Sequence, residues 1–125
     1  MDFELTIVIP VYNEEENLER VYRQMDEFMG NSYVKAKVFF VNDGSVDQSL
    51  AKIREICCRS ERFSYCSFDR NYGLSAAIKA GFDYSDTPWT GYIDADLQTS
   101  PADFTLLLDF AGEYDLVTGV RQNRK

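Results

Sequence analysis

Two carboxylates and an amide lie within five residues of one another, at Asp94, Asp96 and Gln98. Oxygen ligands at this spacing suit a hard divalent cation such as Mg²⁺ or Mn²⁺. Without a cation, two such neighbouring carboxylates repel each other, which raises one pKa. An Asp-x-Asp pair is common, and taken alone it favours an ordinary polar loop between a strand and a helix. The positions of the other polar clusters decide between these two interpretations.

Apolar runs and helical spacing place these residues in an α/β fold. The continuous apolar runs are typical of buried strands of a parallel sheet, and we expect strands at residues 5–11, 38–41, 63–68, 91–93 and 116–118. Apolar residues at helical spacing predict four helices, at residues 18–30, after Asp47, at 75–84 and at 100–112. The alternation of strand and helix predicts one domain, residues 1–125, with a doubly wound, mostly parallel, Rossmann-like sheet flanked by helices.

Signals at the ends of these helices suggest their boundaries. Gly30 and Gly112 are expected to end the first and fourth helices. Asp47 is expected to cap the second helix and Ser100 the fourth. Arg121 belongs to the basic tail that follows the last strand.

Four polar clusters follow the ends of successive strands. Right-handed crossovers bring the carboxyl ends of parallel strands to one edge, where open α/β sheets bind ligands. The ordinary alternative, that these are turn residues, holds for Gly44, Gly73 and Asn42. The clusters are Tyr12-Asn13-Glu14, Asn42-Asp43-Gly44, Asp69-Arg70-Asn71 and Asp94-Ala95-Asp96.

An acidic site binds an anion best through a bridging cation, so a nucleoside diphosphate with Mg²⁺ or Mn²⁺ fits this edge. An Asp at a strand end can accept a hydrogen bond from a base imide or a ribose hydroxyl. Tyr12 can stack on a base or pack against the first helix. The sequence contains neither the G-x-G-x-x-G nor the P-loop pattern, which argues against dinucleotide and P-loop sites.

The composition excludes other classes of protein. A formal net charge of −8 argues against a nucleic-acid surface. We expect no signal peptide, and the sequence has no apolar run near the ~18 residues that a membrane span needs, so a membrane role would require a further segment or a partner. Three cysteines and no histidine favour a reduced, cytoplasmic protein over a disulfide framework or a zinc site.

Taken together, the clusters resemble four motifs of the GT-A family 2 glycosyltransferases, in the order and at the spacing of that family. The resemblance covers nearly the whole chain and is nearest to the dolichyl- and polyprenyl-phosphate sugar transferases. The four motifs are Ile9-Pro10-Val11-Tyr12-Asn13-Glu14, Asn42-Asp43-Gly44-Ser45, Arg70-Asn71-Tyr72-Gly73 and Asp94-Ala95-Asp96-Leu97-Gln98. The nearness to the polyprenyl-phosphate group rests on the last of them together with the later stretch Asp115-Leu116-Val117-Thr118-Gly119-Val120-Arg121.

The resemblance implies a role for each matching residue. The diphosphate metal would be held by Asp94, Asp96 and Gln98, and Arg121 would lie near a phosphate of the donor or acceptor. The donor would be UDP- or GDP-linked, and the acceptor a lipid phosphate or a saccharide. The residues implied to hold the donor nucleotide are Pro10, Tyr12, Glu14, Asp43 and Asn71.

The implied reaction is an inverting transfer of a hexose at the inner face of a membrane. The sequence departs from the family at Asn42, which replaces an acid, at Leu74, which replaces a common Lys, and at Thr99-Ser100-Pro101. Relatives continue into an acceptor-binding half. We therefore expect this chain to bind a sugar nucleotide, to transfer poorly alone, and to expose a sheet edge that invites formation of a homo-oligomer.

Two alternatives remain. One is a catalytically silent nucleotide-sugar-binding module. The other is a receiver-like signalling domain with an acidic Mg²⁺ pocket, which would need an acid pair after the first strand and a Lys after the fifth. Here the first strand ends in Val11-Tyr12-Asn13 and Gly119 follows the fifth.

Overall fold

The computed structural model describes residues 3–31, 35–93, 95, 116–117 and 120–122. Four strand–helix repeats were expected, and three of them lie within these ranges. The expected fourth helix lies outside the described residues. In chain order the elements are β1 (Leu5–Val11), α1 (Leu18–Asn31), β2 (Ala36–Asn42), α2 (Ser49–Arg59), β3 (Phe63–Ser67), α3 (Leu74–Tyr84), β4 (Trp89–Tyr92), β5 (Leu116–Val117) and β6 (Val120–Gln122).

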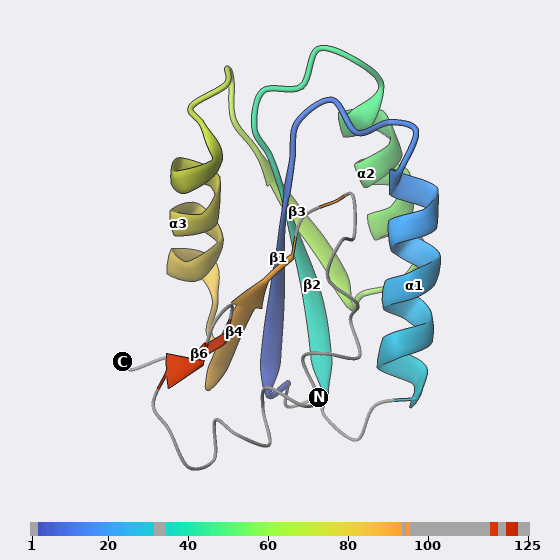
Figure 1. The fold of residues 1–125 in the computed structure, drawn as a ribbon. Helices are drawn as coiled ribbons and strands as arrows, with labels where there is room; N and C mark the ends of the chain where they lie inside the picture. Colours follow the sequence, from blue (N-terminus) through green and yellow to red (C-terminus); the bar gives the residue numbers. More distant parts are fainter. Residues whose placement is uncertain (1–2, 32–34, 94, 96–115, 118–119, 123–125) are drawn as a thin grey trace.

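The strands form one mostly parallel sheet, as the sequence predicts. Their order is β3-β2-β1-β4-β6-β5. β1 pairs in parallel with β2 and with β4, and β2 pairs in parallel with β3. β6 runs antiparallel to both β4 and β5. The carboxyl ends of β1, β2 and β3 therefore meet at one edge, which is the upper edge in Figure 1.

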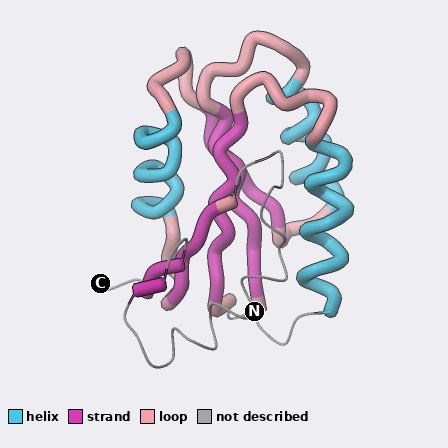
Figure 2. Tube along the Cα trace, in the orientation of Figure 1, coloured by secondary structure: helices cyan, strands magenta, loops and turns pink. Residues whose placement is uncertain are grey.

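Helices cover both faces of the sheet, with α1 and α2 on one side and α3 on the other (Figures 1 and 2). Alternate residues of β1 pack into the hydrophobic cores on the two faces of the sheet. Ile7 and Ile9 belong to the larger core beneath α1 and α2, whereas Val8 packs in the smaller core with Ala77 of α3. A Cβ atom at Gly81 would lie 2.3 Å from Cγ1 of Val8, so α3 rests almost directly on β1.

A guanidinium clasp joins α1 to α2. Both terminal nitrogens of Arg59 donate to the carboxylate of Glu19, each at 3.0 Å, and Arg59 also pairs with Glu55 at 2.9 Å. The same guanidinium lies over the ring of Tyr22, 4.7 Å from its centroid. The hydrogen bonds from Arg59 lower the pKa of Glu19.

Some expected boundaries were wrong. α1 passes through Gly30 and ends at Asn31, whose Nδ2 donates to the carbonyl of Glu27 at 3.0 Å and so satisfies an orphan helix-end acceptor. Gln48 occupies the N-cap position of α2 but makes no side-chain capping bond, and the expected cap Asp47, one residue earlier, accepts the Ser49 N–H at 2.9 Å. β4 begins at Trp89, ahead of the expected Gly91, because the Trp89 N–H joins the ladder through the carbonyl of Glu4.

The segment around Arg121 was also misjudged. It was expected to be a basic tail, but it forms β6, in which Arg121 is paired with Thr90 of β4. Within the described ranges, no helix is both long and apolar enough to cross a membrane.

Candidate functional site

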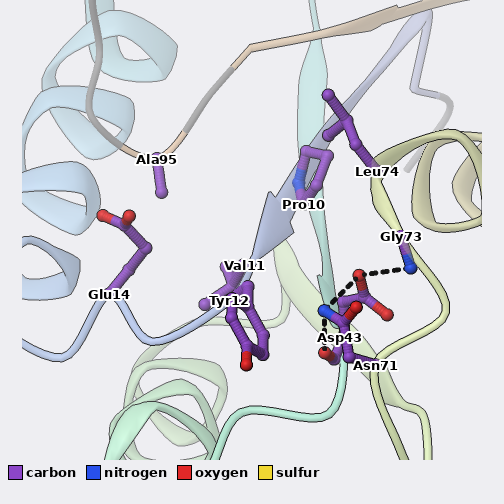
Figure 3. Close-up of a pocket in the computed structure, with 9 residues that line it drawn as sticks. All are labelled: Pro10, Val11, Tyr12, Glu14, Asp43, Asn71, Gly73, Leu74 and Ala95. Carbon is purple, nitrogen blue, oxygen red and sulfur yellow. Dashed lines mark hydrogen bonds between the residues drawn. The ribbon is translucent and has the colours of Figure 1, made fainter.

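A pocket of about 420 Å³ opens at the carboxyl edge of β1 and β2. Each of the four expected polar clusters contributes at least one residue to its wall, and the fourth cluster contributes Ala95. Figure 3 shows Glu14 and Ala95 on one side and Asp43, Asn71 and Gly73 on the other, with Tyr12 between them. The lining residues are Pro10, Val11, Tyr12, Glu14, Asp43, Asn71, Gly73, Leu74 and Ala95.

The loop after β1 supplies an aromatic ring and a carboxylate to the pocket. Tyr12 is 48% exposed and lines the pocket, and its aromatic ring is a group on which a base can stack. One oxygen of Glu14 accepts a hydrogen bond from Nδ2 of Asn17 at 2.7 Å. Pro10 is the penultimate residue of β1 and borders the same space. This loop therefore combines an apolar platform with an acid.

Asp43 is buried, with 4% of its surface exposed, and its carboxylate ties down the loop after β3. Oδ1 accepts from the backbone N–H of Tyr72 at 2.7 Å. Oδ2 accepts from the backbone N–H of Gly73 at 3.0 Å and from Nδ2 of Asn71 at 3.1 Å. Since each carboxylate oxygen can accept two hydrogen bonds, Oδ1 keeps one acceptor position open.

The loops after β2 and β3 are also in direct backbone contact. Gly44 has a φ of +68°, and a Cβ atom there would lie 2.2 Å from the carbonyl carbon of Arg70. Gly73 has a φ of +102° and precedes α3. Both positions require glycine, because L side chains rarely adopt these conformations. Their interpretation as structural turn residues is confirmed.

Asn42, the departure from the usual acid, has a structural role. Its Nδ2 donates to Oγ of Ser67 at 3.0 Å, and its Oδ1 accepts from the backbone N–H of Ser45 at 3.3 Å. The side chain thus links the ends of β2 and β3 and shapes the loop that carries Asp43. Leu74, the departure at the usual Lys, lines the pocket and is 55% exposed.

A second set of hydrogen bonds joins the loop after β1 to the loop after β2. Asn13 bonds to two successive residues of the loop after β2: its N–H donates to Oγ of Ser45, and its Oδ1 accepts from the Val46 N–H, both at 2.9 Å. The Glu14 N–H donates to Oγ of Ser49 at 2.9 Å. Reasoning from the sequence did not assign these contacts.

The expected metal ligands Asp94, Asp96 and Gln98 lie outside the described residues. Ala95, the one described residue of this motif, is buried and lines the pocket. In the part of the chain that the structure describes, no group of three metal-binding side chains comes together.

The register of β6 fixes the backbone of Arg121. It lies opposite Thr90, which pairs with Thr6 of β1. Pro10 is four residues further along β1, a distance of roughly 13 Å at about 3.3 Å per residue. The expected role of Arg121 beside a phosphate stays a prediction.

The pocket wall is acidic. Glu14 and Asp43 contribute carboxylates, and no lysine or arginine is among its described lining residues. Arg70, which precedes the lining residue Asn71 in the chain, is 73% exposed, lies 3.8 Å from Asp69 and stacks over Tyr72. A bound anion would therefore need a cation from outside the described wall.

Comparison with known proteins shows the family to which the chain belongs. A family model described as Glycosyl transferase family 2 matches residues 6–125. The chain belongs to glycosyl transferase family 2. This membership confirms the resemblance seen in the motifs.

Among curated relatives of this family 2 domain, an uncharacterized glycosyltransferase of Synechocystis sp. is 36% identical over 100% of the chain and 40% of its own length. The undecaprenyl-phosphate 4-deoxy-4-formamido-L-arabinose transferase of Klebsiella pneumoniae is 34% identical over 97% of the chain and 38% of its own length. The family 2 domain thus spans about two fifths of these relatives.

A solved structure shares the fold. The mannosyltransferase PcManGT of Pyrobaculum calidifontis, solved in complex with GDP-Man and Mn²⁺, superposes with a TM-score of 0.75 at 16% identity. The match covers 93% of the family 2 domain and 34% of that protein. The GT-A, Rossmann-like fold expected for the domain is confirmed.

Proposed function

We propose that this family 2 domain binds the nucleoside diphosphate of a sugar donor, with Mg²⁺ or Mn²⁺, in a glycosyltransferase that transfers a hexose to a polyprenyl phosphate. One observation carries the proposal. Side chains from the ends of β1 and β2 and from the loop after β3 line one pocket, and Ala95 of the acidic motif lines it with them. The carboxyl edge of an open α/β sheet is where such folds bind nucleotides.

The pocket chemistry suits the nucleoside. The exposed ring of Tyr12 offers a stacking face. The open acceptor position on Oδ1 of Asp43 would favour a base with a ring N–H donor, such as uracil or guanine, over adenine, whose ring nitrogens at that edge are acceptors. Glu14 retains acceptor capacity for a ribose hydroxyl. This assignment favours UDP or GDP as the carrier and leaves both as candidates.

A divalent cation fits the donor set of this edge. Asp94, Asp96 and Gln98 would hold it, since carboxylate and amide oxygens are the ligands that Mg²⁺ and Mn²⁺ prefer. The cation would supply positive charge for the leaving diphosphate, which the described wall does not provide. Glu14 and Asp43 would then remain free to orient the nucleoside.

The acceptor is proposed from chemistry and from a relative. A polyprenyl phosphate is already an anionic nucleophile, so inverting attack on the anomeric carbon needs little help from a general base. The Klebsiella relative is named as an undecaprenyl-phosphate sugar transferase, which supports a lipid phosphate as the acceptor. We propose that the reaction takes place at the cytoplasmic face of a membrane, which the domain reaches through a further segment or a partner.

Isothermal calorimetry with UDP, GDP and ADP, each with Mn²⁺ or with EDTA, tests the binding half of this proposal. We expect UDP or GDP to bind in a Mn²⁺-dependent manner and ADP to bind weakly. Equal, metal-independent affinity for all three would overturn it. Transfer is tested separately, with radiolabelled sugar nucleotide and polyprenyl phosphate, on the full-length protein that contains this domain.

A further inference from the structure

The loop that carries Tyr12 and Glu14 is held in place by side chains from the loop after β2. We propose that Asp47 and Ser49, which do not line the pocket, are positioning residues for nucleotide binding. The inference rests on the proposed function and adds two residues to it. They would act through the backbone of Glu14 and Glu15 without touching the ligand.

One carboxylate reaches both loops. Oδ2 of Asp47 accepts from the Glu15 N–H at 3.3 Å, and Oδ1 accepts from the Ser49 N–H at 2.9 Å. Oγ of Ser49 in turn accepts from the Glu14 N–H at 2.9 Å. Asp47 and Ser49 therefore form a bracket between the start of α2 and the pocket loop.

Three successive backbone donors of the pocket loop are satisfied in this way. The N–H groups of Asn13, Glu14 and Glu15 donate to side chains of Ser45, Ser49 and Asp47 respectively. Asn13 has a φ of +53°, a conformation that a non-glycine residue adopts infrequently. The loop is not part of a strand, and its uncommon shape is held by hydrogen bonds to residues that lie 32 to 35 positions further along the chain.

The environment of the bracket supports its role. Ser49 is fully buried at the first turn of α2, so its hydroxyl has little freedom to move. Burial of Asp47 raises its pKa, but hydrogen bonds from the side chain and backbone of Ser49 and from Glu15 outweigh this effect and lower it. At neutral pH the group is therefore a carboxylate and can accept from both N–H groups.

The variants Asp47→Asn and Ser49→Ala each remove acceptors from the bracket. Ser60→Ala is the matched control, because Oγ of Ser60 also accepts a backbone N–H, that of Arg62, away from the pocket. We expect amide hydrogen exchange at Glu14 and Glu15 to quicken in both bracket variants. We also expect affinity for UDP or GDP with Mn²⁺ to fall about two- to tenfold, the typical factor for one lost hydrogen bond.

A merely structural role would quicken exchange throughout α1, including at Val21 and Met25, instead of at the loop alone. Global quickening, or unchanged loop exchange with unchanged nucleotide affinity, would overturn the inference. A wild-type chain that binds neither nucleotide overturns the proposed function instead. In that case faster exchange confined to Glu14 and Glu15 still supports the bracket, and its absence refutes it.

Discussion

Gly44 lies against the backbone of Arg70 so closely that a Cβ atom at position 44 would be 2.2 Å from the Arg70 carbonyl carbon. The contact joins the loop after β2 to the loop after β3 without any side chain. Two walls of the pocket are therefore set by a backbone-to-backbone approach that glycine alone allows. A single added methyl group is enough to test this contact.

Gly44→Ala should destabilise the fold by at least about 2 kcal/mol, because the left-handed conformation is strained for alanine and the methyl group overlaps Arg70. Gly30→Ala is the matched control. A Cβ atom added at Gly30 in α1 would meet no neighbouring atom within 4 Å, so alanine should stabilise the helix by about 0.5–1 kcal/mol. Urea denaturation of both variants measures the difference. Equal stability of the two would contradict the structure.

Asp43→Asn should loosen the loop at residues 71–73. The amide nitrogen cannot accept from the N–H groups of Tyr72 or Gly73, and leaving such a group unsatisfied costs about 1–3 kcal/mol. Asp69→Asn is the control. The Asp69 side chain is 71% exposed, so removal of its charge should change the free energy of unfolding by no more than about 0.5 kcal/mol. Denaturation and nucleotide titration are to be run together. Wild-type stability in Asp43→Asn would show that the Asp43 carboxylate does not hold the loop at residues 71–73.

Asp96→Ala should remove the Mn²⁺-dependent gain in nucleotide affinity while leaving the fold intact. We expect a loss of at least about tenfold, because even residues that only orient a metal ligand typically contribute about 10- to 100-fold. Asp83→Ala, at an exposed position on α3, serves as the control. Calorimetry with UDP or GDP and Mn²⁺ decides the matter, and unchanged affinity would rule out the ligand role.

Stability should fall in acid partly through the clasp between Glu19 and Arg59. Hydrogen bonding to Arg59 lowers the pKa of Glu19 in the folded state below its ordinary 4.5. The stabilisation is therefore complete above about pH 4.5 and is lost as the pH falls through the lowered value. Glu19→Gln should flatten this part of the profile, whereas the same change at the exposed Glu16 should not. Urea midpoints measured from about pH 7 to about pH 3 test the difference.

Much of the fold could be predicted from local patterns. The apolar run from Leu5 to Val11 coincides with β1, because a strand covered on both faces is apolar throughout. Non-local partners explain the failures. β6 owes its existence to pairing with β4, and nothing within its three residues signals that pairing. The helix beyond Gly30 likewise depends on a side-chain cap from Asn31.

Some of the residues that line the pocket could be predicted from the sequence, but the hydrogen bonds between them could not. The position of Tyr12, Glu14 and Asp43 after strands was enough to place them at one edge, because parallel topology aligns strand ends. That Asp43 would hold Gly73, or that Ser49 would hold Glu14, could not be read from the sequence. Such side-chain to backbone contacts depend on loop shapes that form only when distant loops meet.

Eight of the hydrogen bonds that shape the pocket join residues between 28 and 35 positions apart. Contacts of such separation carry a loop-closure cost and form after local structure. The pocket should therefore appear late in folding, once β1, β2 and β3 are assembled. A ligand that binds only the finished pocket stabilises only that state. In a refolding experiment, nucleotide binding would mark completion of the three-strand core, well after the chain has collapsed.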